Sequence, residues 1–131
     1  MDLPDTRPPF RPEEWFRFVH GEAFARKWSK LALTDDDLRA VEVAIMLGPR
    51  RSPVVRGTGG MRKLRYGDPK AGRGKSGAFR IYYAYFAPFR IVLLTTVFGK
   101  NEADDLSEAG KAAMATLIAE IESQLEGGSI R

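Results

Sequence analysis

The side chains of this chain best suited to chemistry are cations, and they gather in one segment. Residues 50–80 contain ten Lys or Arg side chains and a single acid, Asp68, whereas the other 100 residues contain 11 basic and 16 acidic side chains. Within that segment, Lys63 and Arg65 are two positions apart, and Arg80 follows in the next apolar run. Clustered cations neutralise phosphates and release their condensed counterions. The charge pattern therefore predicts a phosphate-rich partner.

The composition limits the other chemistries. The chain has no Cys, which excludes a disulfide framework, a thiolate metal site and a Cys nucleophile. The single histidine, His20, cannot form a His cluster, and we interpret it as a surface residue. Chemistry must then depend on Lys, Arg, Tyr, Ser or carboxylates, and we predict neither a metal nor a cofactor.

Length and hydropathy predict one domain. A chain of 131 residues with 44% hydrophobic content is long enough for a single core. We expect a Pro-rich extended arm over residues 1–14, the domain over 15–127, and a short tail over 128–131. No run of 18 apolar residues occurs, and the N-terminus lacks the apolar core of a signal peptide. We therefore expect a soluble cytoplasmic protein with no membrane partner.

The elements that must position the cations follow from periodicity and caps. Strand patterns cover residues 15–20, 61–66, 78–86 and 90–98, the last two joined by a tight turn at 87–89. Helices are predicted after His20, from the N-cap Thr34 to Gly48, and from the N-cap Ser107 to about Glu126. The order β-α-α-β-β-β-α predicts an α+β fold with an antiparallel or mixed sheet of about four strands and helices on one face.

Strand alternation places three cations together. Lys63 and Arg65 point to the same face of their strand, and Arg80 shares its face with Tyr82. If the two strands are neighbours, all three cations occupy one sheet face. Because an unpaired charge is costly to bury, we expect that face to be an accessible surface or a ligand site.

Three segments, 57–65, 74–83 and 98–106, resemble successive signature blocks of RelE-type toxins, and the HigB-like branch is the most similar. The resemblance covers roughly residues 15–125 and implies the compact RelE/ParE fold. It also implies an endoribonuclease that cuts messenger RNA in the ribosomal A site without a metal ion. In that reaction the ribose 2′-hydroxyl attacks the adjacent phosphate, so RNA supplies the nucleophile and fixed cations stabilise the developing charge.

Carried over by position, the resemblance assigns catalytic roles to cations of two strands and the following turn. Arg65 and Arg80 would clamp the scissile phosphate, because an Arg fork binds phosphate bidentately. Lys63 would act as a base or electrostatic activator. Lys100 matches the Lys after the last strand. The resemblance leaves the general acid open, and we take Tyr82 as the candidate because it faces the same side as Arg80.

Two positions depart from the best-known RelE branch. Asn101 stands where that branch has an Arg, and Ser107 stands where it has a catalytic Tyr. We interpret Ser107 as a helix cap. The predicted RNA-binding residues outside the reacting centre are Arg62, Arg73, Lys75 and Asn101.

Two other functions remain open on the same fold. One is a ParE-like gyrase inhibitor, against which the three cations argue. The other is a non-catalytic module that binds RNA or a partner protein. The toxin interpretation implies a cognate antitoxin protein as partner, besides the ribosome and its messenger RNA.

Overall fold

The strands and helices follow one another in the predicted order. The computed structural model describes residues 10–67, 78–103 and 106–128. Short 3₁₀ turns span Pro12–Glu14 (η1) and Ala87–Phe89 (η2). The strands are β1 (Arg17–His20), β2 (Arg62–Gly67), β3 (Ala78–Phe86) and β4 (Ile91–Phe98), and the helices are α1 (Glu22–Lys30), α2 (Asp35–Leu47) and α3 (Glu108–Glu126). The β-α-α-β-β-β-α order is therefore confirmed.

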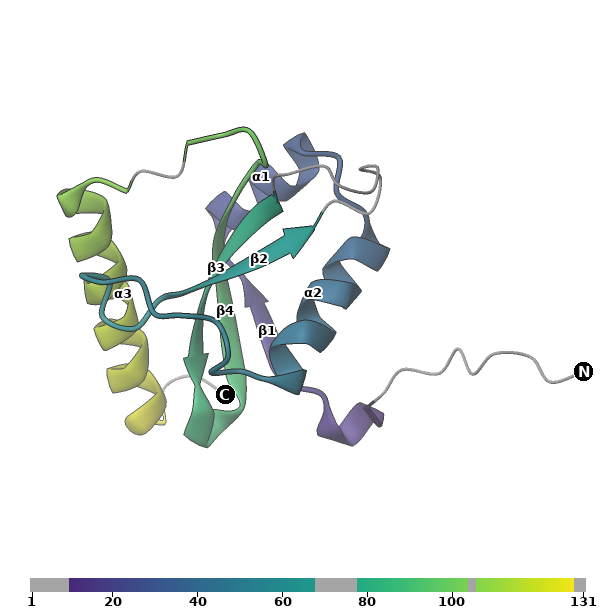
Figure 1. The fold of residues 1–131 in the computed structure, drawn as a ribbon. Helices are drawn as coiled ribbons and strands as arrows, with labels where there is room; N and C mark the ends of the chain where they lie inside the picture. The colour runs from purple at the N-terminus through teal and green to yellow at the C-terminus, as the bar shows by residue number, and fades with distance from the viewer. Residues whose placement is uncertain (1–9, 68–77, 104–105, 129–131) are drawn as a thin grey trace, which may run out of the picture.

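The four strands form one mixed sheet in the order β1-β4-β3-β2. β1 runs parallel to β4, whereas β3 pairs antiparallel with both β2 and β4. β2 and β4 therefore end, and β3 begins, at the same end of the sheet (Figure 1). The basic residues near these strand ends are brought together by this arrangement.

Helices cover both faces of the sheet, which corrects the prediction that they pack on one face. On one face, Phe24 of α1 and Val41 of α2 pack with the strand residues Ile81 and Tyr83. On the other face, α3 packs its apolar side onto a second cluster, and Figure 1 shows α3 and α2 on opposite sides of the sheet. The second cluster contains Met61, Tyr82, Ala84, Phe86, Ile91, Leu93, Met114, Ile118 and Leu125. Because β3 is apolar on both of its faces, both need cover.

Side-chain caps begin the two long helices as predicted. The hydroxyl of Thr34 accepts a hydrogen bond from the Asp37 backbone N–H at 3.1 Å, and the Asp37 carboxylate accepts one from the Thr34 N–H at 2.8 Å. This reciprocal pair is a capping box. Asp37 also accepts a hydrogen bond from the hydroxyl of Tyr66 at 2.7 Å, so the cap of α2 is tied to β2.

The end of the N-terminal arm is folded onto the domain, which corrects the prediction of an extended arm as far as residue 14. Pro12–Glu14 form the 3₁₀ turn η1, and Phe10 packs edge-on against Trp15 with ring centroids 6.3 Å apart. The guanidinium of Arg90 donates a hydrogen bond to the Glu14 carbonyl. A proline at the start of η1 favours the turn, because its φ is already suitable for it.

Candidate nucleic-acid interface

Two arginines lie directly opposite each other where β2 ends and β3 begins. Arg65 pairs with Arg80 in the antiparallel register, and Lys63 pairs with Tyr82. Directly opposed residues of antiparallel strands project to the same face, so Lys63, Arg65 and Arg80 share one face as predicted. Arg65 is exposed, whereas Lys63 and Arg80 are half-buried.

Arg80 is already engaged with the turn that follows β4. Its Nη2 group donates hydrogen bonds to the backbone carbonyls of Gly99 and Glu102. A guanidinium presents several donors in a rigid fork, and one group can therefore hold two carbonyls of the same turn. Since Lys100 lies between these carbonyls, Arg80 positions Lys100 in addition to contributing its own charge.

The Glu102 side chain also stabilises this turn, through its contacts with Gly99 and with Lys27 of α1. Its Oε1 accepts a hydrogen bond from the Gly99 backbone N–H at 2.9 Å, and its Oε2 lies 3.3 Å from Nζ of Lys27 on α1. The hydrogen bond from Gly99 is the main cause that lowers the pKa of the Glu102 carboxyl, with Lys27 and Arg80 contributing. Nζ of Lys27 also lies 3.8 Å from the centroid of the Phe98 ring. The turn is therefore clamped between α1 and β3.

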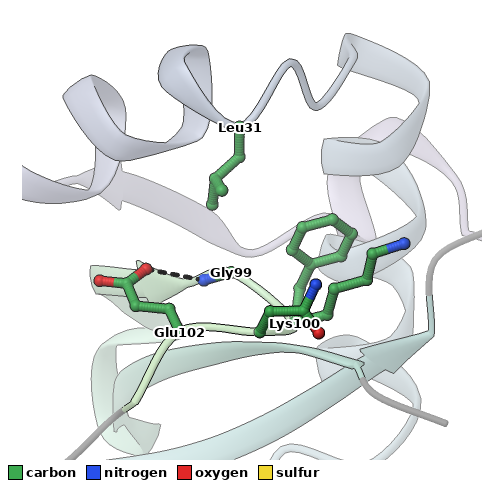
Figure 2. Close-up of a pocket in the computed structure, with 6 residues that line it drawn as sticks. Leu31, Gly99, Lys100 and Glu102 are labelled. Carbon is green, nitrogen blue, oxygen red and sulfur yellow. Dashed lines mark hydrogen bonds between the residues drawn. The ribbon is translucent and has the colours of Figure 1, made fainter.

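The turn borders an open hollow of about 470 Å³. Leu31 lies across this hollow from the turn, and Figure 2 shows the Glu102 carboxylate directed back to the Gly99 amide. The lining residues are Leu31, Phe79, Gly99, Lys100, Asn101 and Glu102. Asn101 is exposed and Lys100 half-buried, so both predicted site residues of this turn lie at one surface.

Tyr82 lies on the predicted face of β3, but α3 covers that face at this point. The side chain of Tyr82 belongs to the cluster beneath α3, the residue is 2% exposed, and its ring packs edge-on against Phe98 at 5.6 Å. The face is therefore accessible at Arg65 and not at Tyr82. This burial argues against a direct contact between Tyr82 and an RNA substrate.

Arg62 lies on the opposite face of β2 from Lys63 and Arg65, because side chains alternate along a strand. Its Nη1 donates hydrogen bonds to the carbonyls of Arg50 at 3.0 Å and Ser52 at 2.7 Å. Arg62 therefore holds the segment after α2 in place. Of the other predicted RNA-binding residues, Arg73 and Lys75 lie outside the described residues.

Sequence reasoning missed Lys27 and Glu102 as parts of this site. Glu102 directly follows Lys100 and Asn101, and an acid beside a predicted functional cation was the signal available for it. Lys27 had no such signal, because it is 75 residues away in sequence and reaches the turn only through the packing of α1 on β4.

The described residues contain neither a cluster of metal ligands nor a membrane-spanning helix. Over residues 10–67, 78–103 and 106–128, no three His, Asp or Glu side chains are grouped so that they could hold a metal ion. No helix in these ranges is both long and apolar enough to cross a membrane.

The fold and the site define an α+β protein that gathers cations at one end of a mixed four-stranded sheet. No family model matches the chain. The solved structures that are similar to it include two toxin structures. One is the Escherichia coli toxin RelE in the free state, with two arginines mutated to alanine: the TM-score is 0.49 at 20% identity, over 75% of this chain and 94% of that one. The other is the intact E. coli RelBE toxin–antitoxin complex, with a TM-score of 0.47 at 20% identity, over 67% of this chain and 99% of that one.

Proposed function

We propose that this chain is the toxin of a type II toxin–antitoxin pair, of the RelE type and its HigB-like branch, and that it cuts messenger RNA on the ribosome. The observation that carries the proposal is the cross-strand pair of Arg65 and Arg80 beside Lys63. Like charges placed directly opposite each other destabilise a sheet. A phosphodiester between them would remove that penalty, and the three sequence blocks that resemble RelE-type toxins point to the same ligand.

The proposed reaction is transesterification within the RNA. The ribose 2′-hydroxyl attacks the adjacent phosphorus, the bond from phosphorus to the 5′-oxygen breaks, and the products are a cyclic phosphate and a free 5′-hydroxyl. Arg65 and Arg80 would stabilise the charge that develops on the phosphoryl oxygens. Lys63 would assist deprotonation of the 2′-hydroxyl, as a base or through its charge.

The turn after β4 would supply the next contacts along the RNA. Lys100 would stabilise the leaving side of the phosphate, and Asn101 would contact the RNA from the exposed part of the turn. The proposed role of Arg62 is indirect, since its guanidinium holds the segment at residues 50–52. A cognate antitoxin would cover the basic end of the sheet and compete with RNA for it.

Two observations favour a second candidate, a non-catalytic RNA-binding module. The guanidinium of Arg80 donates to two backbone carbonyls, and Tyr82 is buried. Both residues would then be structural, and the exposed Arg65 would bind phosphate without cleavage. Only RNA cleavage itself separates this candidate from the toxin.

The test is inducible expression in bacteria, with mapping of new RNA 5′ ends on translated messages. Lys63→Gln and Arg65→Gln are the informative variants, because removal of Arg80 would also release the turn. Arg39→Gln, an exposed cation on α2, is the control. We expect growth arrest with cuts inside reading frames for the wild type and the control, and a loss of both in the two site variants.

The remaining outcomes separate the alternatives. Arrest without new 5′ ends would contradict the nuclease and favour a gyrase inhibitor. Binding of RNA without arrest or cuts would favour the non-catalytic module. A melting curve for each purified variant shows whether a lost effect comes from unfolding.

A further inference from the structure

The last turns of α1 carry a second group of cations, outside the basic segment at residues 50–80. Arg26, Lys27 and Lys30 line a hollow of about 420 Å³ together with Leu31 and Glu102. Arg26 and Lys30 are exposed, whereas Lys27 is half-buried and pairs with Glu102. Over the described part of the chain, neither Arg26 nor Lys30 forms an ion pair. Within residues 10–67, 78–103 and 106–128, the hollow therefore presents two exposed cations that are in no ion pair.

The spacing of Arg26 and Lys30 is unfavourable for the helix alone. Residues four apart lie next to each other on a helix surface, and like charges at this spacing destabilise it. Attraction to the negative end of the helix accounts for a cation in the last turn, where Lys27 and Lys30 lie. Arg26 has Glu22 four residues before it as a favourable neighbour on the helix, whereas Lys30 faces only Arg26 at this spacing. An anion at the hollow would relieve the repulsion.

This hollow adjoins the candidate interface. It shares Leu31 and Glu102 with the hollow that Lys100 and Asn101 line. The carbonyl of Glu102 accepts a hydrogen bond from Arg80, which pairs with Arg65. Figure 1 shows α1 at the same end of the sheet as the segment that follows β4. The cations of α1 and those of the turn after β4 therefore border two neighbouring hollows, and Arg80 connects the turn to β3.

We infer that Arg26 and Lys30 form a second phosphate subsite, which binds the RNA backbone away from the cation pair of β2 and β3. Neighbouring strands are about 4.8 Å apart, so the path from β2 to α1 is longer than one nucleotide. A single phosphate at Arg65 cannot also reach α1, and the subsite must take a different phosphate of the same or another RNA. This inference rests on the proposed function for the identity of the polyanion, and it requires no cleavage.

The test compares the salt dependence of RNA binding for two double variants of equal charge. Arg26→Gln with Lys30→Gln removes the subsite, and Arg39→Gln with Lys111→Gln removes two helix cations elsewhere. The first probe is a single-stranded RNA oligonucleotide with 2′-O-methyl groups throughout, which cannot supply the attacking hydroxyl. The second is ribosomes stripped of messenger RNA, and the third is a poly-glutamate peptide.

For single strands, log K changes with log salt by about 0.7 per phosphate contact. Because the subsite takes one phosphate, we expect the oligonucleotide slope to be about 0.7 smaller for the α1 variant than for the control variant, if the subsite binds the message. A smaller salt dependence of binding to the stripped ribosomes alone would also support the subsite and would assign it to ribosomal RNA. Unchanged slopes in both RNA arms, or a loss confined to poly-glutamate, would overturn it.

Failure of this inference differs from failure of the proposed function. If the wild type cuts messenger RNA and the α1 variant binds RNA with the same salt dependence as the control variant, the proposed nuclease function holds and the inferred subsite is wrong. If the α1 variant lowers the salt dependence of RNA binding and the wild type makes no cuts, the inferred subsite holds and the proposed nuclease function is wrong. If the wild type binds neither the 2′-O-methyl oligonucleotide nor the stripped ribosomes, the inferred subsite is wrong.

Discussion

Arg65 and Arg80 are direct cross-strand partners although both are positively charged. Their surroundings differ: Arg80 is half-buried and donates hydrogen bonds to two backbone carbonyls of the turn after β4, whereas Arg65 is exposed. The pair thus combines a residue that holds the site together with one that is accessible to a ligand. The first two predictions separate these roles.

Arg65→Gln should stabilise the free protein while it weakens RNA binding. Removal of one of two directly opposed like charges relieves repulsion, and cross-strand pairs of this kind are worth roughly 0.2–1 kcal/mol. The midpoint of urea unfolding should therefore rise slightly at low salt, and the gain should shrink at high salt because the repulsion is screened. Arg39→Gln is the control. A lower urea midpoint for Arg65→Gln would mean that packing of the Arg65 aliphatic stem stabilises the protein by more than repulsion from Arg80 destabilises it.

Arg80→Lys should destabilise the protein although it keeps the charge. Both hydrogen bonds come from Nη2, and a Lys side chain ends one bond short of that position, so we expect a loss of about 1–3 kcal/mol in the free energy of unfolding. Hydrogen exchange at the Gly99 amide should become faster, because the turn that holds it loosens. An unchanged midpoint, with activity lost, would instead assign Arg80 to phosphate binding alone.

Glu102→Gln should weaken stability in a pH-dependent way. The Gly99 hydrogen bond and Lys27 lower the pKa of Glu102 below 4.5, so the unfolded chain binds its proton more tightly than the folded one. The stabilisation is therefore present above about pH 4.5 and is lost as the pH falls through the folded pKa.

Urea midpoints of wild type and Glu102→Gln, measured from about pH 7 down to about pH 3, should converge at the acid end. Glu120→Gln, on the exposed side of α3, is the matched control. A difference that stays constant over this range would mean that the Glu102 charge is not coupled to the turn.

Ser107→Ala should lower stability and leave RNA cleavage intact. The Ser107 hydroxyl accepts a hydrogen bond from the Gly110 N–H at 3.0 Å, and loss of such a cap costs about 1 kcal/mol. Ser107→Asp also provides a capping oxygen and should restore the midpoint. Cleavage that is lost in both variants, with the midpoint restored in Ser107→Asp, would reveal a catalytic hydroxyl instead.

Tyr82→Phe should keep most of the cleavage activity. The tyrosine is 2% exposed beneath α3, and Phe preserves the ring that packs on Phe98. The change removes only the hydroxyl that a general acid would need. A large fall in the cleavage rate constant, with an unchanged melting temperature, would show that this hydroxyl reaches the reacting RNA after a rearrangement.

Several features of this chain could be predicted because they depend on neighbouring residues. Caps such as Thr34 and Ser107 act within one helical turn, and strand alternation places Lys63 and Arg65 on one face whatever the rest of the fold does. The element order and an antiparallel or mixed sheet of about four strands were predicted and agree with the structure, whereas the face shared with Arg80 was predicted only if the two strands are neighbours, as they are.

Other features were decided by contacts between residues far apart in the chain. The apolar side of α3 fits either face of a sheet, and only tertiary packing put it on the face of Tyr82, where it buries that residue. The contact of Lys27 with Glu102 spans 75 positions, and the hydrogen bonds of Arg80 depend on where β4 ends. By itself, the sequence determined which cations could face a phosphate. The tertiary structure decided which of them stay accessible, because burial and hydrogen bonding depend on all the elements packed around each side chain.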